Sequence, residues 1–263
     1  MAVRRRRLWL AATVLALPGA LACGCGGGGG GGSTSGKVLF DGDAAELVPH
    51  ATGRSATFRV TATSGGSSDV SGFTSTVTAN EDGGVFVTRY VSATGAVAVS
   101  TSRDTGDEIR VERFVNDPGG PDEQVAVPAP PVGVVRTPVV AGEGFDTGFA
   151  RTLEMDIRIG QSTLHRQVLF TGSAQRIARG RASLTVAAGT YDGAIRYAVR
   201  ATGESRIPVL GESVTLSIEV DGEEWFAPGA GGVKEELDVT VRGGDQSVPI
   251  HFSTERTAPA APG

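Results

Sequence analysis

Alternation of apolar and polar side chains runs through most of this 263-residue chain and constrains its fold more than any other feature. In one run, Leu153, Met155 and Ile157 alternate with charged residues. Strict alternation gives a strand one wet and one dry face, which is typical of antiparallel sheet. We therefore expect an all-β fold. Similar runs cover residues 57–61, 85–91, 108–115, 195–200, 214–220, 237–241 and 248–252.

Turn-forming residues separate these runs. Asp221-Gly222 lies between two apolar stretches and predicts a tight hairpin, and residues 80–84 and 104–107 have similar turn chemistry. We find no convincing long amphipathic helix, although residues 41–48 are compatible with one or two helical turns. The pattern predicts a curved antiparallel sheet, a barrel or a half-barrel, with little helix.

A segment rich in Pro and Gly, residues 116–138, interrupts the strand pattern near the middle of the chain. Two arrangements are compatible with it. Either two small β modules, 37–120 and 132–255, meet here, or one barrel-like sheet carries a long crossing loop. The folded body is expected to cover residues 37–255, with a disordered tail at 256–263.

Residues 1–22 have the features of a secretory signal peptide. Four arginines, 4–7, precede an apolar run of ten residues, 8–17, which is too short to span a bilayer core of about 30 Å as a helix. Ala20-Leu21-Ala22-Cys23 resembles the bacterial lipobox, which implies that Cys23 is lipidated and becomes the new N-terminus. The alternatives are an ordinary cleavage site, lipidation at Cys25, or a twin-arginine export signal.

A glycine-rich stretch separates this cysteine from the body. Residues 26–32 are seven consecutive glycines, which bury no side chains and lose much entropy on ordering. A flexible segment the length of residues 24–36 has an r.m.s. span of about 20 Å. We expect residues 23–36 to form a lipidated cysteine followed by a tether, with the membrane as a partner through that lipid anchor.

Charge and cysteine content narrow the class of protein. The chain has 24 basic and 29 acidic residues, a net charge of −5, and without the four leader arginines the balance is 20 against 29. So acidic a body is a poor partner for nucleic acid. Both cysteines, Cys23 and Cys25, precede the body, so its core must be held by burial alone.

The sequence offers no set of catalytic or metal-binding residues. His50, His165 and His251 lack the spacing of a metal site, and no serine completes a G-x-S-x-G motif. We expect no enzyme activity, no metal and no cofactor.

Charged pairs and a basic cluster are expected to be solvated. The adjacent pairs Glu223-Glu224 and Glu235-Glu236 must point to opposite faces of a strand, so neither pair can serve one substrate jointly. Residues 176–181 contain three arginines, which we expect to lie on the rim of a loop.

One motif carries a resemblance to a known family. The segment W-F-A-P-G-A-G-G-V-K at 225–234 resembles a motif of bacterial lipoproteins of the TapB-like group. The segment T-V-A-A-G-T-Y-D at 185–192 is similar to a second motif of that group. The resemblance covers mainly residues 138–241. It implies a β-rich envelope protein and no enzyme activity.

The motif also has a physical interpretation. Trp225 and Phe226 can bury a large apolar area as a strand ends. Pro228 and Gly229 favour a rigid corner, and Lys234 lies at the start of the next strand. We expect these five residues to form a turn between two strands and to fill one end of the core. The alternative is that they form the rim of a ligand site.

These features predict a lipoprotein of the bacterial envelope, on the outer membrane and facing the periplasm or the surface. It is expected to act as a non-enzymatic binding or structural module. The alternative is a periplasmic carrier of a lipid or another hydrophobic ligand in a barrel-like cavity. A cavity of several hundred Å³ would favour the carrier, and a solidly packed core the module. The protein or hydrophobic-ligand partner is unknown from the sequence.

Overall fold

The structure is a computed structural model that describes residues 8–11, 16–17, 36–121, 123–159, 162–209 and 212–259. The predicted lipidation site Cys23, the alternative Cys25 and the glycine run lie outside the described residues, as do the last four residues of the tail.

Strands make up most of the described chain, as the alternation predicted, and the fold is all-β and antiparallel. The one short helix, α1, confirms the expectation of a helical turn within 41–48. The elements are β1 (Leu8–Ala11), β2 (Ala16–Leu17), β3 (Val38–Phe40), α1 (Ala44–Leu47), β4 (Ser55–Ser64), β5 (Ser67–Glu81), β6 (Val85–Ser92), β7 (Val97–Asp104), β8 (Glu108–Asn116), β9 (Gln124–Ala126), β10 (Val132–Arg136), β11 (Val139–Val140), β12 (Gly144–Ile159), β13 (Ser162–Val186), β14 (Gly189–Val209), β15 (Glu212–Ala227), β16 (Gly231–Gly243) and β17 (Gln246–Arg256).

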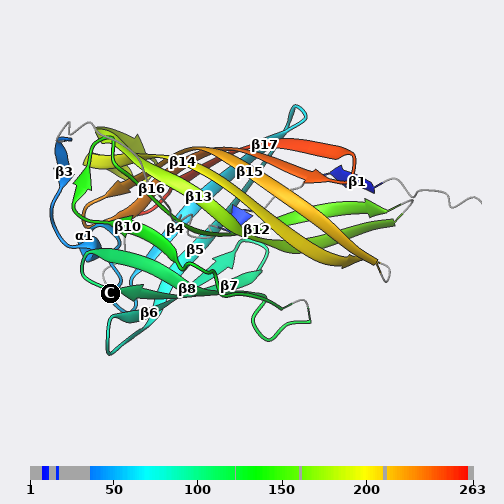
Figure 1. Cartoon of the computed structure of the whole chain (residues 1–263), viewed down its shortest axis with the longest axis horizontal. Helices are drawn as coiled ribbons and strands as arrows, with labels where there is room; N and C mark the ends of the chain where they lie inside the picture. Colours follow the sequence, from blue (N-terminus) through cyan, green and yellow to red (C-terminus); the bar gives the residue numbers. More distant parts are fainter. Residues whose placement is uncertain are drawn as a thin grey trace, which may run out of the picture.

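Twelve of these strands curve into a nearly closed barrel-like sheet (Figure 1). Their order is β12-β13-β14-β15-β16-β17-β4-β5-β6-β7-β8-β10, with every neighbouring pair antiparallel. Within this order β17 joins the strands that follow the Pro/Gly-rich segment to those that precede it. It does so by pairing with β4 from His251↔Thr63 to Arg256↔Phe58. Strands from before and after the Pro/Gly-rich segment share this single sheet.

Side chains and backbone groups bridge the seam where the sheet meets itself. The hydroxyl of Thr147 on β12 accepts a hydrogen bond from the N–H of Gly133 on β10 at 2.9 Å and donates to the carbonyl of Pro131 at 2.6 Å. The N–H of Gly148 also donates to Pro131, at 3.4 Å. The barrel is therefore closed here by the Thr147 hydroxyl and one backbone hydrogen bond rather than by a continuous ladder.

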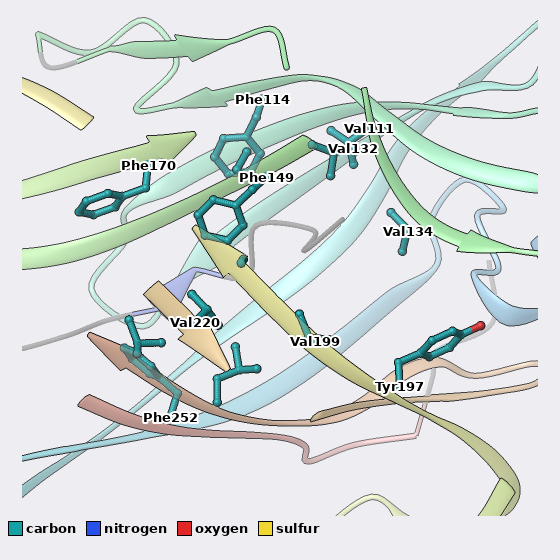
Figure 2. Packing of buried hydrophobic residues seen from close by; sticks show 14 of the residues in the cluster. Val111, Phe114, Val132, Val134, Phe149, Phe170, Tyr197, Val199, Val220 and Phe252 are labelled. Atoms are coloured by element: carbon teal, nitrogen blue, oxygen red, sulfur yellow. The ribbon is translucent and has the colours of Figure 1, made fainter. Parts of the chain in front are cut away.

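The inward faces of the strands pack into one apolar core (Figure 2). Phe114, Phe149, Phe170 and Phe252 are at most 1% exposed and come from β8, β12, β13 and β17. Burying such side chains stabilises the fold by roughly 1.5–3 kcal/mol each. The buried apolar residues of these and the neighbouring strands form one contiguous cluster that occupies the barrel interior.

Two predicted turns are confirmed and one is wrong. Turns at residues 82–84 and 105–107 separate β5 from β6 and β7 from β8. Asp221-Gly222, however, lies in the middle of β15. A Cβ at position 222 would clash with the carbonyl oxygen of Glu236 and lie 2.8 Å from the Cα of Leu237 on β16. Glycine is required there because the neighbouring strand comes close, not because the chain turns.

One end of the elongated barrel is covered by the segment that enters β4 (Figure 1). There β3 pairs with β11 in a separate two-stranded sheet, and α1 follows. Ala44 and Leu47 of α1 are completely buried in the core. The helix thus acts as a cap whose apolar side closes the barrel interior.

Segments near the two ends of the chain also contact the sheet. Within the described part of the predicted leader, β1 pairs with β12 from Leu8↔Ile159 to Ala11↔Asp156, and β2 pairs with β12 at Thr152 and Leu153. At the other end β17 runs through Arg256, where the sequence analysis placed the start of the tail.

Gly172 provides a test of the strand packing. A Cβ there would clash with the carbonyl oxygen of Thr202 and lie 2.6 Å from the Cα of Gly203 on β14. We expect Gly172→Ala to lower the free energy of unfolding, measured by urea denaturation, by about 1–3 kcal/mol, as overpacking does. The control is Gly232→Ala, whose Cβ would meet nothing nearer than the Phe226 ring at 3.8 Å. Equal stability of the two variants would contradict the described pairing of β13 with β14.

Candidate functional site

The predicted motif lies at the capped end of the barrel. Trp225 and Phe226 are buried at the end of β15, and the turn at 228–230 leads into β16. Phe226 belongs to the main core, whereas Trp225 packs into a small second cluster with Ala194, Ala227 and Val233. The Nζ of Lys234 lies 5.4 Å from the centre of the Trp225 ring and 2.9 Å from a Glu236 carboxylate oxygen.

Three contacts hold this turn against the barrel. Arg54 donates to the carbonyl of Gly229, and Arg256 donates to the carbonyl of Ala230 at 2.6 Å. The N–H of Gly229 donates to the carbonyl of Glu46 on α1 at 2.7 Å. Pro228 and Gly229 themselves are exposed, and Gly229 has a φ of +74°, which glycine adopts without strain.

A cavity of about 220 Å³ lies against this turn, inside the capped end. Trp225, Phe226 and Lys234 of the predicted motif line it, whereas Pro228 and Gly229 do not. Phe58 and Phe73 form part of its wall with stacked rings, 4.8 Å between centroids. The further apolar wall comes from β5, β6, β8 and β10 and consists of Val77, Phe86, Ile109, Val111 and Val134.

A buried ion pair forms the polar side of the cavity. Arg176 of β13 is 1% exposed, and its Nη2 lies 2.5 Å from a carboxylate oxygen of Glu224, which is itself buried. Arg176 also donates to the carbonyl of Val134. The expectation that Arg176 and Glu224 are solvated is therefore wrong, because both side chains point into the barrel rather than out of it.

A second buried pair lies beside the first. Arg151 of β12 is completely buried and donates to both carboxylate oxygens of Glu235, at 2.8 and 3.2 Å. Its guanidinium carbon lies 5.2 Å from the centre of the Phe252 ring. Glu235 was expected at a solvated edge, yet its side chain is only 12% exposed. The prediction that adjacent glutamates point to opposite faces holds for Glu223 and Glu224, since Glu223 is half-exposed and pairs with Arg196, away from the cavity.

Burial perturbs the acid of the first pair. Loss of solvent raises the pKa of Glu224 from 4.5 to about 7, against the opposing effect of Arg176. The neighbouring carboxylate of Glu235 raises it further, and Arg151 acts in the opposite direction.

The histidines discussed in the sequence analysis are dispersed. The ring of His50 stacks on Phe86 at 4.3 Å, and its Nε2 lies 3.4 Å from Asp104. His251 is half-exposed beside Glu236 and Asp238, and the side chain of His165 lies outside the described residues. Among the described residues no group of three His, Cys, Asp or Glu side chains is arranged to hold a metal ion. In that same part of the chain no helix is long and apolar enough to span a membrane.

Sequence reasoning missed Arg151, Arg54 and Arg256 as site residues. The signal that could have found two of them is the alternation itself. Arg151 lies two positions before Leu153, and Arg256 lies four positions after Phe252, so both share the parity of core residues on their strands. We found no comparable signal for Arg54, which precedes β4.

The comparisons with known proteins add a distant likeness. No family model and no curated protein matches the chain. The chain is similar to the structure of a candidate lipoprotein from Parabacteroides distasonis, with 13% identity and a TM-score of 0.38 over 85% of this chain and 98% of that chain. It is also similar to a candidate exported protein with a YmcC-like fold from Bacteroides fragilis, with 14% identity and a TM-score of 0.38 over 86% and 100%. Likeness at this level is too low to transfer a function.

Glu224 provides a pH test of the buried pair. An unfolded glutamate releases its proton near pH 4.5, whereas the folded protein keeps it until about pH 7. Glu224 therefore contributes stability below pH 4.5 that is lost as the pH rises toward 7, with a limiting slope of about 1.4 kcal/mol per pH unit. We expect the free energy of unfolding of the wild type, minus that of Glu224→Gln, to fall across this window in denaturant titrations.

The matched control is Glu223→Gln, which removes the adjacent carboxyl on the other face of β15. A wild-type minus Glu224→Gln difference that does not change between pH 4.5 and 7, or the same trend in Glu223→Gln, would contradict the assignment to the buried carboxyl.

Proposed function

We propose that this protein is a lipid-anchored module of the bacterial envelope that binds a small ligand without enzymatic chemistry. The sequence supports the anchor, since a basic and apolar leader ends at Ala20-Leu21-Ala22-Cys23 and a glycine-rich tether follows. The TapB-like resemblance of residues 138–241 supports the same class of protein.

The observation that carries the binding role is the cavity at the capped end. A barrel used only as a structural element gains nothing from charge in its interior, because buried ion pairs often contribute less stability than well-packed apolar residues. Here Arg176, Glu224 and Arg256 all line one cavity beside aromatic side chains. An apolar cavity with a few convergent polar groups is the usual form of a small-molecule site.

The alternative role, a carrier of lipid, is less well supported by the same geometry. The cavity volume of about 220 Å³ is below the roughly 300–1,000 Å³ typical of small-molecule sites. The remainder of the barrel is packed by large apolar residues such as Phe149 and Phe170. A lipid with two long acyl chains would have to displace that core.

Processing would change one edge of the sheet. Cleavage before Cys23 removes β1 and β2, which pair with residues 152–159 of β12. In the mature protein β12 would then lack these two partner strands. The folded body would begin at β3 and would be connected to the lipid by the tether.

The anchor is tested in cells fed radiolabelled palmitate. We expect label in the wild type and in Cys25→Ser, the matched control, and none in Cys23→Ser, because only Cys23 has the lipobox order before it. Native mass spectrometry of the membrane-extracted wild type is expected to show a covalent acyl mass on a chain beginning at Cys23 and a small non-covalent ligand. Equal labelling of all three proteins would refute the anchor, and a bound two-chain lipid would favour the carrier.

A further inference from the structure

Two arginines at the capped end, Arg54 and Arg256, differ in their partners from Arg151 and Arg176. Arg151 and Arg176 each face a carboxylate, Glu235 and Glu224. Arg54 and Arg256 line the same cavity, but among the described residues neither forms an ion pair with an acid. Their guanidinium groups instead donate to the carbonyls of the turn after β15.

Arg256 is the more unusual of the two. It is only 2% exposed, and within the described chain its Nε–H has no hydrogen-bond acceptor. Burial lowers the pKa of its guanidinium, the Tyr191 hydroxyl partly offsets this, and repulsion from nearby Arg54 lowers it further. A buried cation without a counter-charge is costly, and an anion placed between the two guanidinium groups would relieve both the desolvation and the repulsion.

An apolar surface begins directly beside these cations. The guanidinium carbon of Arg256 lies 5.7 Å from the centre of the Phe58 ring, and Phe58 stacks on Phe73. Both rings line the cavity, and Phe86 continues the wall. A cationic and an apolar surface therefore meet in this cavity, so it matches a ligand that has both a charged head and an apolar body.

We propose that the end cavity binds an amphiphilic anion, with its carboxylate or phosphate head between Arg54 and Arg256 and its apolar body against Phe58, Phe73 and Phe86. This inference rests on the proposed binding function and specifies its ligand class. A guanidinium fork matches both kinds of head group. A volume of 220 Å³ corresponds to about seven groups the size of a water molecule, each about 30 Å³, so the apolar body is a single chain of about seven or eight carbons.

The charges of the cavity disfavour a cationic head. Its two carboxylates, Glu224 and Glu235, are already engaged by Arg176 and Arg151. The two groups without an opposite charge are both positive. A cationic ligand would have to displace an existing ion pair, whereas an anion would supply the negative charge that Arg54 and Arg256 lack.

Isothermal titration calorimetry on the purified mature chain at pH 7.5 tests the proposal with four probes that share an eight-carbon chain. These are octanoate, octyl phosphate, octanol and octyltrimethylammonium. We expect saturable binding of octanoate, of octyl phosphate, or of both, with the tighter of the two identifying the head group. Octanol is expected to bind at least tenfold more weakly, and octyltrimethylammonium not at all.

Three variants locate the head group. Arg54→Gln and Arg256→Gln are each expected to weaken binding of the anionic probe by about tenfold or more, as loss of a charge-assisted hydrogen bond does. The matched control is Arg59→Gln, on the outward face of β4, because Arg59 is 53% exposed and already paired with Glu255. Arg59→Gln should bind like the wild type. Since Arg256 is buried, its variant is first checked by thermal unfolding, and the half-buried Arg54 keeps the test valid if Arg256→Gln does not fold.

The outcomes separate the ligand class from the binding role. If octanol binds as tightly as octanoate and Arg54→Gln changes neither, the cavity is a binding site but the anionic head is wrong. If octyltrimethylammonium binds best, the charge assignment is wrong. If none of the four probes binds the folded wild type, both this inference and the binding role of the end cavity are overturned.

Discussion

Buried guanidinium groups determine how the capped end of this barrel is organised. Among the described residues the three largest fully buried side chains are Arg151, Arg176 and Arg256, in an interior that is mostly aliphatic and aromatic. Each must regain the interactions that it loses with water. Arg151 and Arg176 do so with Glu235 and Glu224, and Arg256 does so with a carbonyl of the turn after β15. The inward glutamates of β15 and β16 and the carbonyl groups of that turn meet this requirement.

The strand content could be predicted from alternation, because a half-buried strand needs only local sequence to show its two faces. The closing of the sheet could not, since it depends on register between distant segments. The junction of β17 with β4 and the Thr147 seam involve residues more than ten positions apart, with no local signature. Asp221-Gly222 shows the opposite error, in which turn chemistry suggested a hairpin where the glycine only admits a neighbouring strand.

The site was predicted in part. The W-F-A-P-G segment was singled out by its resemblance to a lipoprotein motif, and the structure places its aromatic residues and the nearby Lys234 at the cavity. The arginines and glutamates were assigned to solvent because charged residues usually lie there. The alternation along their strands indicates an inward position for Arg151 and Arg256. An inward position can be predicted for a charged residue, however, only when its partner on another strand is known. That partner is non-local, which is why sequence alone failed here.

The proposed anchor would keep the proposed small-molecule site close to a membrane, at a distance that the flexible tether allows to vary. The cavity depends on the turn at 228–230 being held in place by Arg54 and Arg256, since this turn and the residues that follow it form one wall of the cavity.

Hydrogen–deuterium exchange tests this claim most directly. The amide of Gly229 donates to Glu46, and that geometry depends on Arg54 and Arg256 holding the neighbouring carbonyls. The account predicts that Arg54→Gln speeds exchange across residues 227–232 while β5, β6 and β7 keep wild-type protection. Unchanged protection of residues 227–232 in a folded Arg54→Gln variant would contradict it.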